Sequence, residues 1–209
     1  MQVTLGRFIT LEGGEGVGKT TQSALLAEAL ASRGIAVVRT REPGGSPGAE
    51  LLRDILLSGA TDWAPAAETL LHFAARAEHV AKTIRPAIAA GQWVICDRFF
   101  DSTLAYQGYG QGADNAFIGS LIGMVGIVPD LTIVLDVPED IAAGRMLLRG
   151  LAADRYERLD AAFHARVRQG FREIAMANPR RCVLADASGA IQSVHTTVLT
   201  AVWTRFAAS

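Results

Sequence analysis

The sequence predicts an α/β fold in which a parallel sheet of five strands is flanked by helices on both faces. Short β-branched or apolar runs of strand length occur at residues 8–11, 35–39, 93–96, 131–135 and 182–185. Helical patterns lie between them, and the clearest are at residues 21–33, 49–57, 68–90, 116–125, 141–148, 161–177 and 191–206. Strands that alternate with helices indicate crossover connections and therefore a parallel sheet. Because 50% of the 209 residues are hydrophobic, we expect one core and a single domain over residues 1–209.

The first strand leads into the motif G-x-x-x-x-G-K-T, which is typical of loops that bind phosphate. Its residues are Gly13, Gly14, Glu15, Gly16, Val17, Gly18, Lys19 and Thr20. Glycines let the backbone N–H groups of such a loop converge on phosphate oxygens, and the helix N-terminus adds partial positive charge. Lys19 is expected to reach the β- and γ-phosphates, and the Thr20 hydroxyl to bind Mg²⁺. A glycine-rich turn that binds nothing is the alternative, but the complete motif between strand and helix favours a P-loop NTPase fold that binds a nucleoside triphosphate.

The composition argues against a nucleic-acid or membrane partner. Twenty basic and twenty-one acidic residues give a net charge of −1, and no apolar run reaches membrane-spanning length. Residues 1–7 lack the charged and apolar regions of a secretory signal. Cys96 and Cys182 are too few for a disulfide framework and are expected to be small buried side chains, which is typical of a reducing cytoplasm.

Charged residues follow the second and third predicted strands, where ligands of parallel sheets bind. Asp97 ends one strand and suits a carboxylate linked to Mg²⁺. Arg41 and Arg98 are expected to enter the same crevice, where guanidinium groups suit a second phosphorylated substrate. For each arginine alone, a surface salt bridge is the alternative. Residues 150–158 are polar and arginine-rich, which is typical of a small mobile lid, at about residues 149–158.

These motifs together resemble the bacterial thymidylate kinases. The matching stretches are Arg41-Glu42-Pro43-Gly44-Gly45, Ala74-Ala75-Arg76, Asp97-Arg98-Phe99, Ala105-Tyr106-Gln107-Gly108 and Asp154-Arg155-Tyr156-Glu157, besides the phosphate loop. The resemblance covers about residues 8 to 190. It implies a homodimeric cytoplasmic enzyme that uses ATP and Mg²⁺ to phosphorylate dTMP to dTDP on the route to dTTP.

The resemblance also implies roles for individual residues. Glu15 is expected near the sugar 3′-hydroxyl, Arg41 and Arg98 on the dTMP phosphate, and Arg76 on a thymine carbonyl. Tyr106 is expected under the deoxyribose, where it leaves no room for a 2′-hydroxyl, although an aromatic residue on a helix is also often core. Further substrate contacts are implied for Pro43, Ser102, Thr103 and Gln107, and ATP contacts for the loop, Thr21 and Arg145.

Two departures from the family pattern change what is expected. His72 occupies the position where family members usually carry a phenylalanine that stacks on thymine, and the adjacent Phe73, also a candidate contact, points about 100° away on a helix. His72 either stacks as a neutral imidazole or is a core or surface histidine.

The second departure is Gly16, where some members carry an arginine. Arg149, Arg155 and Arg158 of the lid are then the candidates that neutralise charge during transfer, unless they are ordinary solvated charges. The expected catalytic set is Lys19, Glu15, Arg98, Arg149 and Arg155.

Two other functions compete with this one. A kinase for another nucleoside or deoxynucleoside monophosphate would share the loop and the sheet. A nucleotide-switched binding protein would share them too, but a GTPase should carry an N-K-x-D guanine signature, which this sequence lacks.

Overall fold

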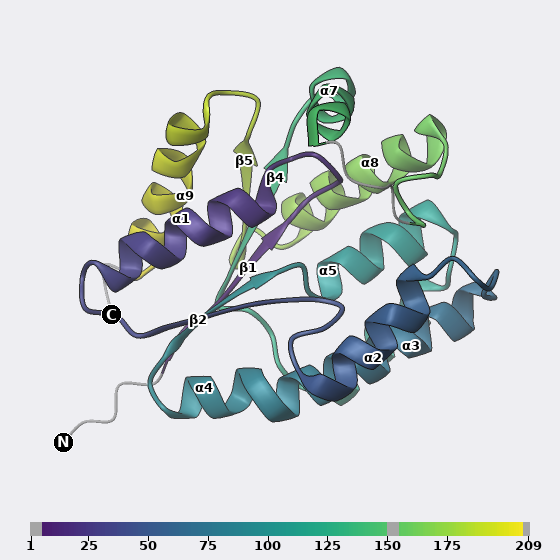
Figure 1. The fold of residues 1–209 in the computed structure, drawn as a ribbon, viewed down its shortest axis with the longest axis horizontal. Coiled ribbons are helices and arrows are strands. Elements are labelled where there is room, and N and C mark those ends of the chain that lie inside the picture. The colour runs from purple at the N-terminus through teal and green to yellow at the C-terminus, as the bar shows by residue number, and fades with distance from the viewer. Residues whose placement is uncertain (1–5, 150–154, 207–209) are drawn as a thin grey trace.

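Residues 6–149 and 155–206 are described by the computed structural model, and within them five strands form one parallel sheet (Figure 1). The strands are β1 (Phe8–Glu12), β2 (Val37–Arg41), β3 (Trp93–Asp97), β4 (Leu131–Asp136) and β5 (Cys182–Asp186). Their order across the sheet is β2-β3-β1-β4-β5, and every neighbouring pair is parallel. The predicted parallel sheet is therefore confirmed, with β1 and its phosphate loop at the centre.

Each predicted helix has a counterpart. The helices are α1 (Lys19–Ala31), α2 (Pro47–Leu57), α3 (Pro65–His79), α4 (Arg85–Ala89), α5 (Phe100–Thr103), α6 (Asn115–Val125), α7 (Glu139–Arg149), α8 (Ala161–Ala177) and α9 (Ile191–Phe206). Two π-helical segments, η1 (Val80–Ile84) and η2 (Leu104–Gly110), continue α3 and α5. Proline lacks the N–H of a regular helical turn, so the wider turn of η1 just before Pro86 keeps the helix predicted over 68–90 continuous.

The second strand differs from its prediction by two residues. The β-branched run predicts residues 35–39, whereas pairing begins with Val37 opposite Trp93 and ends with Arg41 opposite Asp97. Strand β2 lies at the edge of the sheet, where polar side chains such as Thr40 are tolerated because one side is open. This shift carries Arg41 to the carboxyl edge of the sheet, level with Asp97.

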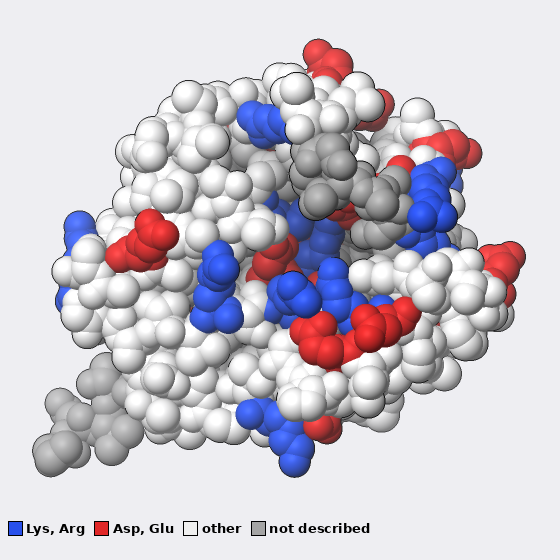
Figure 2. Space-filling model, in the orientation of Figure 1, with Lys and Arg blue, Asp and Glu red and all other residues white. Residues whose placement is uncertain are grey.

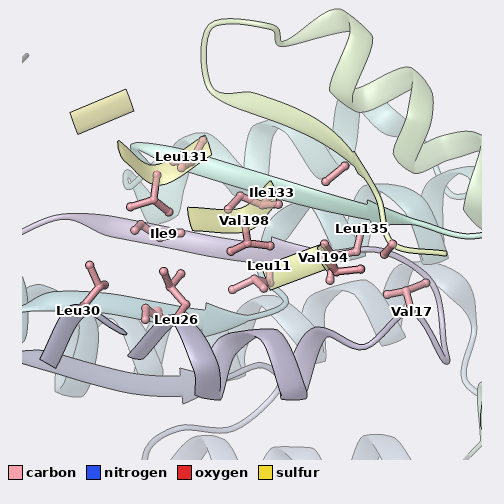
Figure 3. Close-up of a cluster of buried hydrophobic side chains, with 14 of the residues drawn as sticks. Ile9, Leu11, Val17, Leu26, Leu30, Leu131, Ile133, Leu135, Val194 and Val198 are labelled. Carbon is pink, nitrogen blue, oxygen red and sulfur yellow. The ribbon is translucent and has the colours of Figure 1, made fainter. Parts of the chain in front are cut away.

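The core follows the alternation of side chains along the strands. Ile9 and Leu11 of β1 point to the face covered by α1 and α9, where they meet buried residues such as Leu26 and Val198 (Figure 3). Phe8 points to the opposite face, which α4 and its neighbours cover. Because both faces of the sheet are covered, all five residues of β1 are buried, including the polar Thr10 and Glu12.

Both cysteines are buried and unpaired, which confirms the prediction made for them. Among the described residues, no helix is long and apolar enough to cross a membrane. A buried ion pair joins Asp101 of α5 to Arg181, the residue before β5, through Nη1 at 2.6 Å and Nη2 at 2.8 Å. This ion pair joins α5 to the start of β5, the edge strand on the opposite side of the sheet from β2.

Candidate active site

A cavity of about 990 Å³ lies at the carboxyl edge of the sheet. Figure 2 shows it as a hollow, with basic side chains inside and acidic side chains along its lower edge. Its wall includes most of the predicted residues: Glu15, Gly16, Val17, Gly18, Lys19, Thr20, Thr21, Arg41, Pro43, His72, Arg76, Asp97, Arg98, Ser102, Thr103, Tyr106, Gln107 and Arg145. Residues far apart in the sequence are thus brought to one place.

The phosphate loop connects β1 to α1 and folds around the amine of Lys19. Its Nζ donates to the carbonyl oxygens of Gly13 at 3.1 Å and Gly14 at 2.6 Å. Burial, together with the charge of Arg98, lowers the pKa of Lys19 to about 8. The amine is therefore held inside the loop, where anionic oxygens would stabilise its charged form.

Gly16 is required by the conformation and the packing of the loop. Its φ is +70°, and a Cβ built on it would lie 2.5 Å from the carbonyl oxygen of Ala142 in α7. Both facts exclude a side chain unless α7 shifts.

Thr20 and Asp97 provide neighbouring hard oxygen atoms. The Thr20 hydroxyl donates to Asp97 Oδ2 at 2.7 Å, so the start of α1 and the end of β3 meet. A hydroxyl and a carboxylate suit Mg²⁺, which keeps several waters and binds phosphate oxygens. No group of three or more His, Cys, Asp or Glu side chains able to hold a metal occurs among the described residues. The donor set therefore fits a Mg²⁺ that is held partly by phosphates.

Arg98 joins the phosphate loop to helix α5 and η2. Its Nη1 donates to Gly13 O at 3.0 Å and to Ser102 Oγ at 3.2 Å, and its Nη2 donates to Glu15 Oε1 at 2.6 Å. The Tyr106 hydroxyl donates to the same Glu15 oxygen at 2.8 Å. Burial opposes the charge of Arg98, but Glu15 and other nearby acids outweigh it and raise the pKa of Arg98 further.

Glu12, at the end of β1, forms hydrogen bonds with residues that follow Arg98 in the chain. It is fully buried and accepts from the Phe99 N–H at 2.7 Å and the Ser102 hydroxyl at 2.6 Å. Burial, then the charge of Asp101, raises the pKa of Glu12 to about 8. The side chain is therefore mostly protonated at neutral pH.

Arg76 is a buried arginine with one unused donor. Its Nε donates to Glu42 Oε2 at 2.7 Å and its Nη2 to Thr103 Oγ1 at 3.2 Å. Its Nη1 is buried and has no partner among the described residues. Glu42 is held on its other oxygen by His79 Nδ1 at 3.0 Å, so the guanidinium is fixed in place. An unpaired buried donor beside a cavity is suited to an acceptor atom of a ligand.

His72 is neutral and hydrogen-bonded. Its Nε2 lies 2.8 Å from the Tyr156 hydroxyl, which gives its own proton to Glu68 at 2.7 Å, so Nε2 of His72 must be the donor. Burial, then the charge of Arg76, lowers the pKa of His72 to about 3. Phe73 faces elsewhere, packed with Ile118 and Leu121, so the structure does not bring it to the cavity.

Side chains at the two ends of the cavity are tied to the protein. Arg41 is half exposed and pairs with Glu50 at 3.1 Å, while Arg53 donates to Pro43 O at 2.7 Å. At the opposite end, Arg145 of α7 donates to the carbonyl oxygen of Ser188 at 3.3 Å. The cavity therefore has two ends with basic groups, and the phosphate loop lies between them.

The predicted lid is described only in part. Residues 150–154 and the side chain of Arg149 lie outside the described residues. Arg155 pairs with Glu68 at 2.5 Å and with Asp62 at 3.6 Å rather than lining the cavity. Arg158 is exposed.

Several site residues are absent from the sequence-based set. They are Glu12, Glu42, Arg53, Glu68 and Tyr156. One signal for Glu68 was available, because Glu68, His72 and Arg76 recur every four residues and therefore share one face of α3. The others depend on contacts across the fold.

The central strand, the phosphate loop and the buried lysine define a protein of the P-loop NTPase fold. A family model described as thymidylate kinase matches residues 11–198. The thymidylate kinase of Rhizorhabdus wittichii is 54% identical over 201 residues, which cover 94% of this chain and 97% of that protein. The thymidylate kinase of Gluconobacter oxydans is 51% identical, with 94% of each chain covered.

A solved structure leads to the same family. The crystal structure of thymidylate kinase from Ehrlichia chaffeensis is 40% identical, has a TM-score of 0.79, and covers 94% of this chain and 98% of that one. Together with the family model, these relatives show that the chain belongs to the thymidylate kinase family. The resemblance inferred from the motifs is confirmed.

The protonated state of Glu12 predicts a pH-dependent stability. Its pKa is about 8 in the folded protein and 4.5 as the ordinary value, so between these values the folded chain holds one proton more than the unfolded chain. The free energy of unfolding should therefore fall as pH rises, by at most about 1.4 kcal/mol per pH unit from this group. Glu12→Gln removes the titration and should flatten this slope, measured by urea unfolding between about pH 5 and 8.

The exposed Glu28 offers a matched control for this experiment, because Glu28→Gln removes a carboxylate from the surface of α1. We expect its slope to follow that of the unchanged protein. An equal slope in Glu12→Gln and Glu28→Gln would contradict the protonated state of Glu12.

Proposed function

We propose that this chain is a thymidylate kinase that transfers the γ-phosphoryl group of ATP to dTMP, with Mg²⁺ bound, and gives dTDP and ADP. The observation that carries the proposal is that one cavity joins the phosphate loop to Arg76, whose buried Nη1 has no hydrogen-bond partner among the described residues. A thymine carbonyl would accept from this donor, and family membership names the same substrate. The chain would act as one catalytic domain.

The donor nucleotide would occupy the end of the cavity formed by the phosphate loop, Thr21 and Arg145. The N-terminus of α1 and the backbone N–H groups of the loop favour the triphosphate there. Lys19 would exchange its hydrogen bonds to the loop carbonyls for hydrogen bonds to phosphate oxygens. Anionic oxygens stabilise a buried ammonium group more strongly than neutral carbonyl oxygens do. Gly189, which lines the cavity next to Arg145, would border the base.

The acceptor nucleotide would occupy the other end. Arg41 and Arg98 would hold the dTMP phosphate, Pro43, Ser102 and Thr103 would line the pocket, and Glu15 would lie near the 3′-hydroxyl. His72 would border the base as a neutral ring. Phe73 would support this pocket only indirectly, through its contact with Arg76 at 4.6 Å.

Transfer would proceed in line, without a covalent enzyme intermediate. A dTMP phosphate oxygen forms a bond to the γ-phosphorus while the bond from that phosphorus to the β,γ-bridging oxygen breaks, and ADP leaves with the electron pair. The acceptor is already an anion, so positioning and charge neutralisation suffice. Mg²⁺, held by Thr20, Asp97 and phosphate oxygens, would neutralise part of the charge.

Arginines of the lid would neutralise the remaining charge, because Gly16 leaves no room for an arginine in the loop. Arg149 and Arg155 are the proposed residues. Arg155 would first have to exchange Glu68 and Asp62 for phosphate oxygens.

Activity is tested with a panel of nucleoside monophosphates in a coupled assay that follows ADP. We expect Mg²⁺-dependent turnover of dTMP in preference to dCMP, dGMP and AMP. Lys19→Met should lower kcat by roughly 10²–10³-fold, because it removes a charge aimed at the transferred group. Equal use of AMP, or ATP hydrolysis that needs no acceptor, would contradict the proposal.

Sugar selection is tested at Tyr106, which is 5% exposed and lines the cavity. Tyr106→Ala should lower the kcat/KM ratio of dTMP to its ribonucleotide about tenfold, because space opens for a 2′-hydroxyl. Tyr106→Phe keeps the ring and should keep most of the ratio. Phe163→Ala is the control, since Phe163 packs on Tyr106 at 6.0 Å without lining the cavity. A ratio unchanged in Tyr106→Ala would assign Tyr106 to the core alone.

We also propose that the protein is cytoplasmic and forms a homodimer. The exposed apolar residues of α2 and α3 support the homodimer. These two helices lie side by side in Figure 1 and expose 68% of Leu51, 45% of Ile55 and 49% of Leu70. Sedimentation equilibrium should give a mass about twice 22.2 kDa.

The paired change Leu51→Glu and Ile55→Glu should give the monomer mass, because charges would then lie in the interface. Leu147→Glu on α7, where the leucine is 83% exposed, should leave the dimer intact. A monomeric unchanged protein would refute the homodimer.

A further inference from the structure

Glu68 is a fully buried carboxylate on which four donors converge. Its Oε1 accepts from Gln107 Nε2 at 2.8 Å, Gln111 Nε2 at 2.9 Å and the Tyr156 hydroxyl at 2.7 Å. Its Oε2 accepts from Arg155 Nη1 at 2.5 Å. A buried charge is costly unless hydrogen bonds and an opposite charge compensate it, and here both are present. Glu68 therefore links α3, η2 and the segment after the undescribed residues.

The charge state of Glu68 decides which hydrogen bonds it can make. Burial raises its pKa, but hydrogen bonds from Tyr156, Gln107 and Gln111 and the charge of Arg155 outweigh burial, so the pKa lies below its ordinary value. An ionised carboxylate only accepts hydrogen bonds. The amide of Gln107 must therefore turn its NH₂ end toward Glu68, and the network fixes this orientation.

The carbonyl oxygen of the Gln107 amide remains available to accept a hydrogen bond from a ligand. Its Nε2 donates to Glu68 and lies 3.2 Å from the Tyr156 hydroxyl, whereas its Oε1 accepts no hydrogen bond from the described residues. Gln107 and Arg76 both line the cavity. The residues of this wall thus include an acceptor, Gln107 Oε1, and a guanidinium, that of Arg76, whose Nη1 has no hydrogen-bond partner among the described residues.

Pyrimidine bases differ in the hydrogen-bond donors and acceptors that they would present to Gln107 and Arg76. Thymine and uracil carry a ring N–H next to a carbonyl, which complements an acceptor and a donor. Cytosine carries an unprotonated ring nitrogen next to an amino group, which presents the opposite pattern. A site whose buried polar groups are left unpaired by the wrong base discriminates strongly against it.

We infer that Glu68 is a positioning residue that holds Gln107 as a hydrogen-bond acceptor and thereby selects bases with a ring N–H beside a carbonyl. The inference rests on the proposed function, because it takes the acceptor base to occupy this part of the cavity. Glu68 acts through Gln107 and does not itself touch the base.

Glu68→Gln tests the inference, because the new amide keeps the volume but can present an NH₂ group to Gln107. Gln107 can then turn its carbonyl toward residue 68 and its amine toward the cavity. We expect the kcat/KM ratio of dTMP to dCMP to fall about tenfold or more, and KM for dTMP to rise more than kcat falls. Glu68→Asp, which keeps an acceptor-only carboxylate, should retain most of the ratio.

Asp101→Asn is the matched control. Asp101 is as buried as Glu68 and also pairs with an arginine, Arg181, so its change removes the same kind of ion pair elsewhere. We expect a lower Tm with an unchanged base ratio. This separates base selection from general loss of stability.

Gln107→Met provides a second test that does not depend on the folding of Glu68→Gln. It removes the acceptor at nearly constant length and should lower the base ratio about tenfold as well. An unchanged ratio in either folded variant overturns the inference while leaving the proposed function intact. Absence of dTMP phosphorylation by the unchanged protein would instead overturn both.

Discussion

The hydrogen-bonded ion pair between Arg98 and Glu15 is the interaction on which the geometry of the site depends. Arg98 is the one non-glycine residue with positive φ among the described residues, at 70°. Such a backbone costs on the order of 1–3 kcal/mol and persists only where surrounding contacts impose it. Here the contacts are the Gly13 carbonyl, the Ser102 hydroxyl and the Glu15 carboxylate. One guanidinium therefore fixes the phosphate loop relative to α5, and any ligand that contacts Arg98 acts on both.

Other basic groups of the cavity are oriented by acids in the same manner. Glu42 holds Arg76 from behind, and Glu50 holds Arg41 at the rim. A buried pair contributes little net stability because desolvation offsets attraction, but it fixes direction. The effect differs with exposure. Buried Arg76 keeps one donor without a partner among the described residues, whereas exposed Arg41 can leave Glu50 for an anion at little cost.

The elements of the fold were predictable because local patterns determine them, while much of the site was not. Strand β1 is recognisable from its apolar run, and the phosphate loop from its spacing. Strand β2 begins and ends two residues later than predicted, because its polar C-terminal residues are tolerated in a strand at the edge of the sheet. The contact of Glu68 with Tyr156 joins residues 88 positions apart, so no local pattern indicates it. The sequence left open whether His72 stacks. The structure adds a hydrogen bond and a neutral ring, which still permit stacking.

The contact between Gly16 and α7 has a consequence for catalysis. A side chain at position 16 would collide with the Ala142 carbonyl, so helix α7 itself excludes an arginine from the loop. The same helix carries Arg145 toward the cavity and ends at Arg149, where the segment containing Arg155 begins. In the proposed mechanism, an arginine that assists Lys19 at the transferred phosphoryl group would then come from that segment rather than from position 16 of the loop. The placement of α7 therefore excludes a loop arginine, and under the proposed mechanism it would also account for the use of lid arginines, so that the two features would occur together.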